Sequence, residues 1–134
     1  MTVVEQLLEN SESDRDLLQK NLAMGDVPAT PRDAEFVLYA KDQKRAATVC
    51  SFIHDNSFGR AICQEVPENP VDCQHRIIVS IFTPTTEHAI CAASGLMVFL
   101  ADMFDLNYDG WGCSLQKEAI QRATDNDGAA PRRV

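Results

Sequence analysis

The sequence predicts an α+β fold in which two helices cover one face of a four-stranded antiparallel sheet, with a further helix before the first strand. Segments of helical and strand periodicity follow each other in the order helix, strand, helix, strand, strand, helix, strand. The two consecutive strands are joined by the turn-rich "PENPVD", which favours an antiparallel hairpin. At 134 residues the chain is long enough to build one domain around one hydrophobic core.

The leading helix is expected from about residue 13 to residue 24. Ser13 is a weak N-cap, and Gly25 ends the helix. The polar run "ENSESD" interrupts the apolar pattern before it, so residues 1–12 are expected to form a partly ordered N-terminal segment. A proline-containing link then leads to "EFVLYA", whose β-branched and aromatic residues are typical of a strand.

The middle of the chain predicts a helix and a hairpin. Apolar residues recur at i, i+3, i+4 and i+7 from Ala46 to Ile53, which predicts an amphipathic helix from about Asp42 to His54. "RAICQEV" and "HRIIVSIFT" follow as two strands. The second is apolar on both faces, which is typical of a central strand.

A long helix is expected from about Thr85 to Phe104. It contains thirteen residues without a charge, too few to span a bilayer, so we expect a buried core helix. The small residues 92–95 would let it lie close to the sheet. "YDGWGCSL" then has the length of a strand, and residues 116–134 are expected to form a partly disordered tail.

Right-handed connections arrange these elements as a ferredoxin-like βαββαβ sandwich over residues 13–115. In this arrangement the first and third strands are central, and the YDGWG strand is an edge beside the first. The face opposite the two helices would be exposed, or partly covered by the leading helix.

Five cysteines stand at positions 50, 63, 73, 91 and 113, with no C-x-x-C pair. The N-terminus lacks the basic start and apolar run of a signal peptide, so we expect a cytoplasmic protein. We therefore predict that the cysteines are reduced and mostly buried, with no disulfide needed for folding.

The stretch "YDGWG" places the single tryptophan between two glycines. Simple alternation puts Tyr108, Gly110 and Gly112 on one face of the strand, and Asp109 and Trp111 on the other. In one interpretation Trp111 plugs an end of the core, and the glycines permit a bulge that aims it. In the other, Trp111 and its flanking acid form a recognition spot on an edge strand.

The formal net charge of −8 disfavours direct contact with nucleic acids and anionic membranes, and it favours basic partners. Acids are frequent in residues 1–35 and include Asp14, Asp16 and Glu35. They form either a solvated surface or a docking surface for a basic protein. The paired acids lack the ligand set of an EF-hand, and no motif of an enzyme is present. We therefore expect no metal, no cofactor and no catalytic residue.

The segment "FDLNYDGWG" resembles the closing motif of the regulator of ribonuclease activity B family, inhibitors of ribonuclease E. "LLQKNLAMGDVPATPRDAEFVLYAKDQKRAATV" is similar to the family in the order of its elements, and the resemblance covers about residues 13–115. The chain departs from the family at Phe36, where histidine is frequent, and in its ending "GAAPRRV", where an acidic tail is frequent.

The resemblance implies a non-catalytic, bacterial-type protein that binds the endoribonuclease at its basic, non-catalytic region and changes RNA turnover. The partner-binding candidates are then Asp14, Asp16, Glu35, Tyr108, Asp109 and Trp111, with Gly110 and Gly112 as structural residues. Two alternatives remain. One is a small-molecule sensor that uses the sheet near the glycines, and the other is an immunity or antitoxin-type inhibitor of another enzyme.

Overall fold

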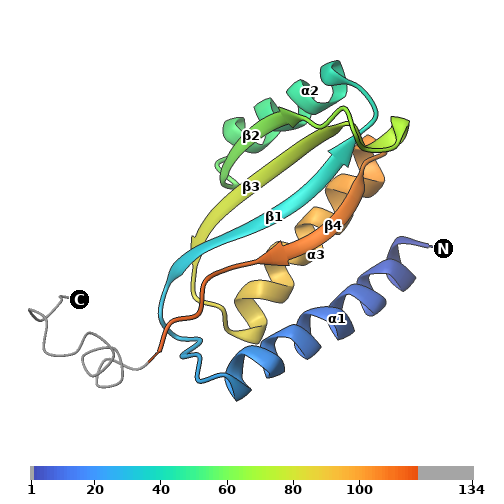
Figure 1. The fold of residues 1–134 in the computed structure, drawn as a ribbon. Coiled ribbons are helices and arrows are strands. Elements are labelled where there is room, and N and C mark those ends of the chain that lie inside the picture. Colours follow the sequence, from blue (N-terminus) through green and yellow to red (C-terminus); the bar gives the residue numbers. More distant parts are fainter. Residues whose placement is uncertain (1, 118–134) are drawn as a thin grey trace, which may run out of the picture.

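The computed structural model describes residues 2–117 and contains a four-stranded antiparallel sheet with three α-helices (Figure 1). The strand order is β2-β3-β1-β4, which confirms the predicted topology with β1 and β3 in the centre. In chain order the elements are α1 (Val3–Ala23), β1 (Arg32–Ala40), α2 (Gln43–Asp55), β2 (Arg60–Glu65), a 3-10 turn (Val71–Cys73), β3 (His75–Thr83), α3 (Glu87–Phe104) and β4 (Asn107–Gly112).

The core lies between one face of the sheet and the helices α2 and α3. Buried and exposed residues alternate along the first part of β1, and Phe36 and Leu38 are fully buried. They pair with Val79 and Ile77 of β3, so the apolar side chains of both central strands reach the same layer. The helices contribute the following fully buried residues to this layer: Val49, Ile53, Ile90, Met97 and Leu100.

Helix α1 begins ten residues earlier than expected, at Val3 rather than at Ser13. Thr2 accepts a hydrogen bond from the backbone N–H of Glu5, and the Glu5 carboxylate accepts one from the N–H of Thr2, which completes a capping box. This cap at Thr2, rather than one at Ser13, starts the helix. The predicted start was therefore wrong, because the polar run inside the helix does not interrupt it.

Helix α1 packs against α3 (Figure 1). Of the two arrangements that the sequence allowed, the structure therefore has the one in which the leading helix leaves the open face of the sheet uncovered. A Cβ built at Gly95 would lie 3.6 Å from Cδ2 of Leu7, so this small residue of α3 faces α1. Its neighbour Ser94 contacts Tyr108 of the sheet, so the small residues of α3 allow a close approach on both sides. α3 is long and apolar enough to cross a membrane by length and composition alone. Its residues Ile90, Met97 and Leu100 are nevertheless fully buried in the domain.

The connection between α1 and β1 is held by a buried ion pair. Arg32 donates from its guanidinium to Oδ1 of Asp26 at 2.6 Å, and both side chains are at most 3% exposed. Arg32 also donates to the carbonyl oxygens of Val27, Thr30 and Ser114. These bonds satisfy a charge that would otherwise be costly to bury, and they tie the chain after β4 to the chain before β1.

The cysteines are free, but none of the five is buried, which corrects the expectation that most of them lie in the core. Cys63 is exposed and the other four are partly exposed. Cys63 and Cys113 lie on or just after the two edge strands, where the core layer ends, so apolar sequence surroundings did not imply burial. The predicted tail, residues 116–134, falls almost entirely outside the described residues.

Candidate functional site

A bulge in β4 sets the directions of the aromatic side chains in the YDGWG motif. Leu38 of β1 pairs with Tyr108 and the preceding Val37 pairs with Gly110, so Asp109 is an extra residue without its own partner. Gly110 has φ +111°, a conformation that side-chain-bearing residues rarely adopt. The bulge therefore turns Tyr108 and Trp111 to the same face of the sheet. The prediction of simple alternation, which placed them on opposite faces, was wrong.

Trp111 is half-buried at the margin of the core. It pairs with Phe36 of β1, and the two ring centroids lie 6.3 Å apart with an interplanar angle of 31°. Its Nε1–H donates to Oδ1 of Asp14 at 3.0 Å. These contacts agree with the interpretation in which Trp111 closes one end of the core and a glycine permits the bulge that aims it.

Asp14 lies inside the domain, only 3% exposed, and so corrects the expectation of a surface acid on the leading helix. Its Oδ1 accepts from Trp111 and from the hydroxyl of Ser94 at 3.3 Å, and its Oδ2 accepts from Nδ2 of Asn10 at 3.1 Å. Burial raises the pKa of Asp14 above the ordinary value of 3.8, and the bonds from Ser94 and Trp111 oppose that rise. Asp14 therefore fixes α1 to α3 and β4, and its carboxylate is not presented to a partner.

Tyr108 completes this buried network from the other end of the bulge. Its hydroxyl lies 2.7 Å from Oγ of Ser94, and Ser94 also accepts from Nδ2 of Asn10 at 2.8 Å. Burial raises the pKa of the Tyr108 phenol well above its ordinary value of 10.0, so it stays protonated. The network joins α1 to two consecutive elements much later in the chain, α3 and β4, and positions α1 beside the last strand.

Two adjoining hollows form a groove between α1 and β4. They have volumes of about 410 and 380 Å³, and both are lined by Asn10, Ser13 and Tyr108. The first extends towards Glu9, and the second towards Trp111. The groove is open and partly polar, with no apolar enclosure of the kind that holds most small ligands.

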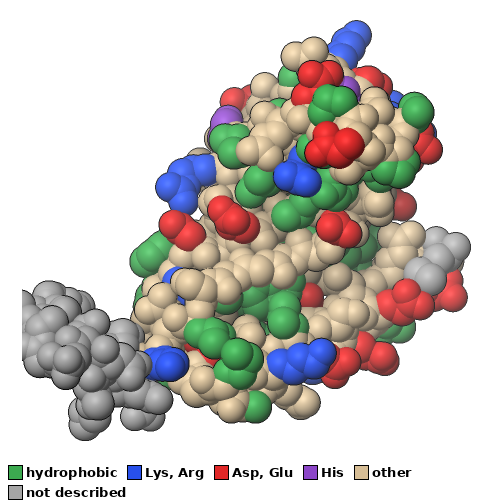
Figure 2. All heavy atoms as spheres, viewed as in Figure 1, with side chains coloured by type: hydrophobic (Ala, Val, Ile, Leu, Met, Phe, Trp, Pro, Cys, Tyr) green, Lys and Arg blue, Asp and Glu red, His purple; other side chains and the backbone are tan. Residues whose placement is uncertain are grey.

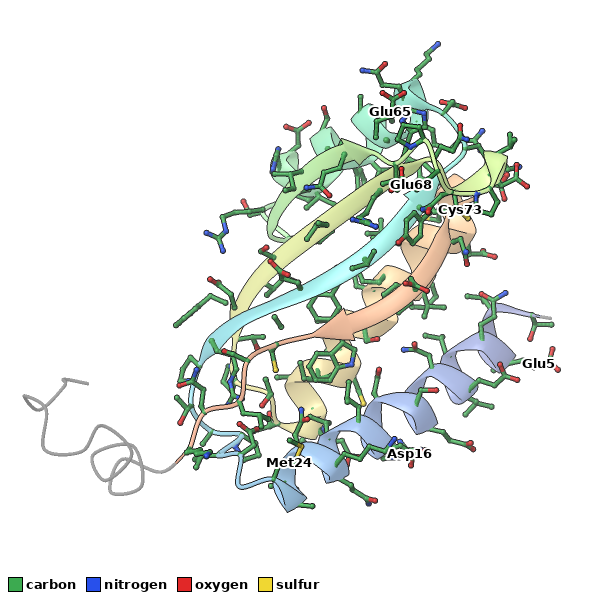
Figure 3. All side chains as sticks on the ribbon, viewed as in Figure 1. Glu5, Asp16, Met24, Glu65, Glu68 and Cys73 are labelled. Atoms are coloured by element: carbon green, nitrogen blue, oxygen red, sulfur yellow. The ribbon has the colours of Figure 1, made fainter. Side chains whose placement is uncertain are left out.

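The outer face of α1 carries a stripe of acids, which we call the acidic stripe: Glu5, Glu9, Glu12 and Asp16. Their spacing of four, three and four residues places them on one side of the helix, and all four are exposed. Figure 2 shows acidic side chains gathered over α1 at the lower right, and Figure 3 shows Glu5 and Asp16 directed away from the sheet. The stripe is flanked by only two cations within the helix, Arg15 and Lys20.

The remaining candidates lie on the sheet. Glu35 is exposed on β1 opposite Gly112, and Asp109 is exposed at the bulge of β4. A Cβ built at Gly110 or Gly112 would meet nothing within 4 Å. Asp16, Glu35 and Asp109 are therefore accessible to a partner, whereas Asp14, Tyr108 and Trp111 support the surface from beneath.

Sequence reasoning missed two members of the buried network, Asn10 and Ser94. A signal existed for Asp14, because it follows Leu7 by seven residues and precedes Leu18 by four, and so shares their helical face. Asn10 and Ser94 had no such signal beyond being polar residues within amphipathic or apolar helices. In residues 2–117 no group of three or more His, Cys, Asp or Glu side chains has the arrangement of a metal site.

A sequence model of one protein family matches residues 11–113, and the family is described as regulator of ribonuclease activity B. The match begins within α1, and it ends just after β4. It therefore includes the bulge, Trp111 and every member of the buried network except Asn10. No protein with curated annotation matches the chain at the threshold of the search.

Proposed function

Because the chain belongs to the regulator of ribonuclease activity B family, we propose that it binds an endoribonuclease of the ribonuclease E type in the cytoplasm and lowers its activity. In this proposal the acidic stripe docks on a basic region of the enzyme outside its catalytic site. The chain acts as a protein-binding regulator and carries out no chemistry of its own.

The observation that carries the docking mode is the acidic stripe. Four exposed carboxylates on one helical face give α1 a negative side, in a chain whose formal net charge is −8. The ion pairs described in residues 2–117 use other acids, namely Asp26, Asp33 and Asp105. Such a surface steers a basic partner during association and competes with RNA for the same basic region of the enzyme.

The groove and the bulge shape the proposed binding surface next to the acidic stripe. The rigid network under α1 holds the stripe at a fixed angle to β4, where Asp109 adds an exposed acid. A partner segment that follows α1 would therefore meet carboxylates along one side and the rim of the groove along the other. Preorganisation of this kind reduces the cost of ordering the interface on binding.

A charge-reversal experiment tests the proposal. We expect Glu9→Lys with Asp16→Lys to slow association with full-length ribonuclease by about tenfold or more, because both positions lie in the stripe. Glu65→Lys with Glu68→Lys is the matched control. It changes the net charge equally, and Figure 3 shows these two residues at the opposite end of the molecule. The control should retain most of the wild-type association rate.

Salt and enzyme truncation complete this experiment. Affinity for the full-length enzyme should fall steeply with ionic strength, since exposed charges are screened within about 8 Å at physiological salt. An enzyme fragment limited to its catalytic portion should escape inhibition. Equal inhibition of both enzyme forms would overturn the docking mode, and absence of binding to either form would overturn the proposed partner.

A ligand-binding role makes a different prediction. The groove between α1 and β4 is the feature that favours the small-molecule alternative. A sensor would show a rise in melting temperature with a ligand of low molecular mass, and its binding would not depend on Asp16, which lines neither hollow of the groove. The single charge reversal Asp16→Lys therefore separates the two functions.

A further inference from the structure

Two cysteines from different elements lie in direct contact. Cys50 is on α2, Cys63 is on β2, and their Sγ atoms are 2.8 Å apart. Both are free thiols in this structure. Residues on a helix and on the strand beneath it thus already have the proximity that a covalent bond between them would require.

Cys63 is the accessible member of the pair. It is exposed, and it lines a hollow of about 170 Å³ together with Gln43, Ala47 and His75. Cys50 is only partly exposed and does not line this hollow. A small reagent would therefore reach the sulfur of Cys63 first.

The hydrogen bonds around the pair favour the same order. The Cys63 thiol lies 3.6 Å from the carbonyl oxygen of Ala46 and can donate its proton to that oxygen. In the contact between the two sulfurs, Cys50 is then the donor and Sγ of Cys63 the acceptor. Burial, together with the bond to Cys63, raises the pKa of Cys50 to about 12. Cys50 therefore remains a thiol until Cys63 has reacted.

We propose that Cys50 and Cys63 form a thiol–disulfide site that closes reversibly when it meets a disulfide of low molecular mass. The thiolate of Cys63 attacks one sulfur of the small disulfide, forms a mixed disulfide and expels one small thiolate. Cys50 then loses its proton and attacks the Cys63 sulfur, which expels the second small thiolate. Two protein thiols are oxidised, one small disulfide is reduced, and the two protons end on the two small thiols.

In residues 2–117 the contact between two sulfur atoms is that of Cys50 with Cys63, and the other three cysteines have neighbours of other kinds. Sγ of Cys73 accepts from Nδ2 of Asn107 at 3.8 Å, and the thiol of Cys113 lies near Arg32. Cys91 lies on α3 near Asp14. The site is therefore specific to one pair among five cysteines, and the bond would fasten α2 to an edge strand of the sheet.

Thiol counting on the full chain tests the proposal with oxidised glutathione as the probe. The number of free thiols should fall from five to three without formation of dimers, and dithiothreitol should restore it. The Cys63→Ser variant has four thiols and should keep all four. The matched control Cys73→Ser also has four and should fall to two. Retention of all five thiols in the wild type would overturn the proposal.

Peptide mapping and melting identify the bond. Trypsin leaves Cys63 and Cys73 on one peptide, so the Cys73→Ser background is used to show that peptide 46–60 is linked to peptide 61–76. Because the bond closes a loop between positions 13 apart, oxidation should raise the melting temperature by about 5 °C or more. A bond to any other cysteine, or stable glutathione on Cys63, would overturn the proposal.

Discussion

Replacement of Trp111 by alanine and, separately, by phenylalanine measures what holds α1 to the sheet. The bond from Nε1–H of Trp111 to Asp14 is 3.0 Å long and ends on a carboxylate that is only 3% exposed. Hydrogen bonds to charged groups contribute about 1.5–3 kcal/mol. Trp111→Phe keeps a ring against Phe36 but removes the donor, so we expect this variant to lose about that much free energy of unfolding.

Trp111→Ala removes the ring as well as the donor. Large aromatic truncations in packed positions cost about 3–5 kcal/mol, and we expect the alanine variant to fall in that range. Asp109→Ala is the matched control on the same strand, and because Asp109 is exposed, its effect should stay within about 0.5 kcal/mol.

Urea unfolding followed by circular dichroism is the suitable assay, because the variants lack the only tryptophan and hence its fluorescence. A double-mutant cycle with Asp14→Asn should give a coupling energy of about 0.5–3 kcal/mol, as expected for groups in direct contact. If both Trp111 variants unfold at the same urea concentration as the wild type, Trp111 does not stabilise the fold. The interpretation in which Trp111 contacts a partner would then be the one that remains.

Two further predictions concern Asp14 and Gly110. The folded state binds the Asp14 proton more tightly than the unfolded state, because burial raises its pKa above 3.8. The contribution of this group to stability is therefore greatest at acidic pH and is lost as the pH rises above 3.8 through the raised value. Urea midpoints should be compared for wild type and Asp14→Asn over this range. The midpoint of the wild type should fall relative to that of the variant as the pH increases, and parallel profiles would contradict the prediction. Gly110→Ala should cost about 1–3 kcal/mol, because φ is +111° there. Gly112→Ala should cost less than about 0.5 kcal/mol, since nothing lies within 4 Å of the added Cβ. Equal costs at the two glycines would contradict the bulge as the reason for Gly110.

The sheet and its two covering helices were predictable because their signals are local. "HRIIVSIFT" coincides with β3, and the turn-rich link before it does separate two antiparallel neighbours. Helix α1 was predicted only in part. Its polar residues Asn10 and Asp14 lie on the inward side, and they are tolerated there because Ser94 and Trp111 satisfy them. Those partners are more than 75 positions away, so no local pattern indicates them.

The candidate site was predicted less well than the fold, for a similar reason. The composition of YDGWG indicated a bulge, but its place depends on the pairing of β4 with β1. One extra residue reverses the side to which each earlier side chain points, so Tyr108 and Trp111 could not be assigned to one face from alternation alone. Asp16 and Asp14 differ by only two positions, yet the rotation of the helix puts one in solvent and the other in the interior.

The buried network also has a consequence for how the chain is assembled during synthesis. Asp14 emerges early from the ribosome, but two of its three hydrogen-bond donors, Ser94 and Trp111, follow 80 and 97 positions later, on α3 and β4. Until α3 and β4 have been synthesised, α1 has no surface to pack against, and its inward polar groups must stay in water. Contacts over such sequence distances form slowly and late. The first helix to be made is therefore among the last to be fixed, and a chain that stops before α3 leaves it undocked.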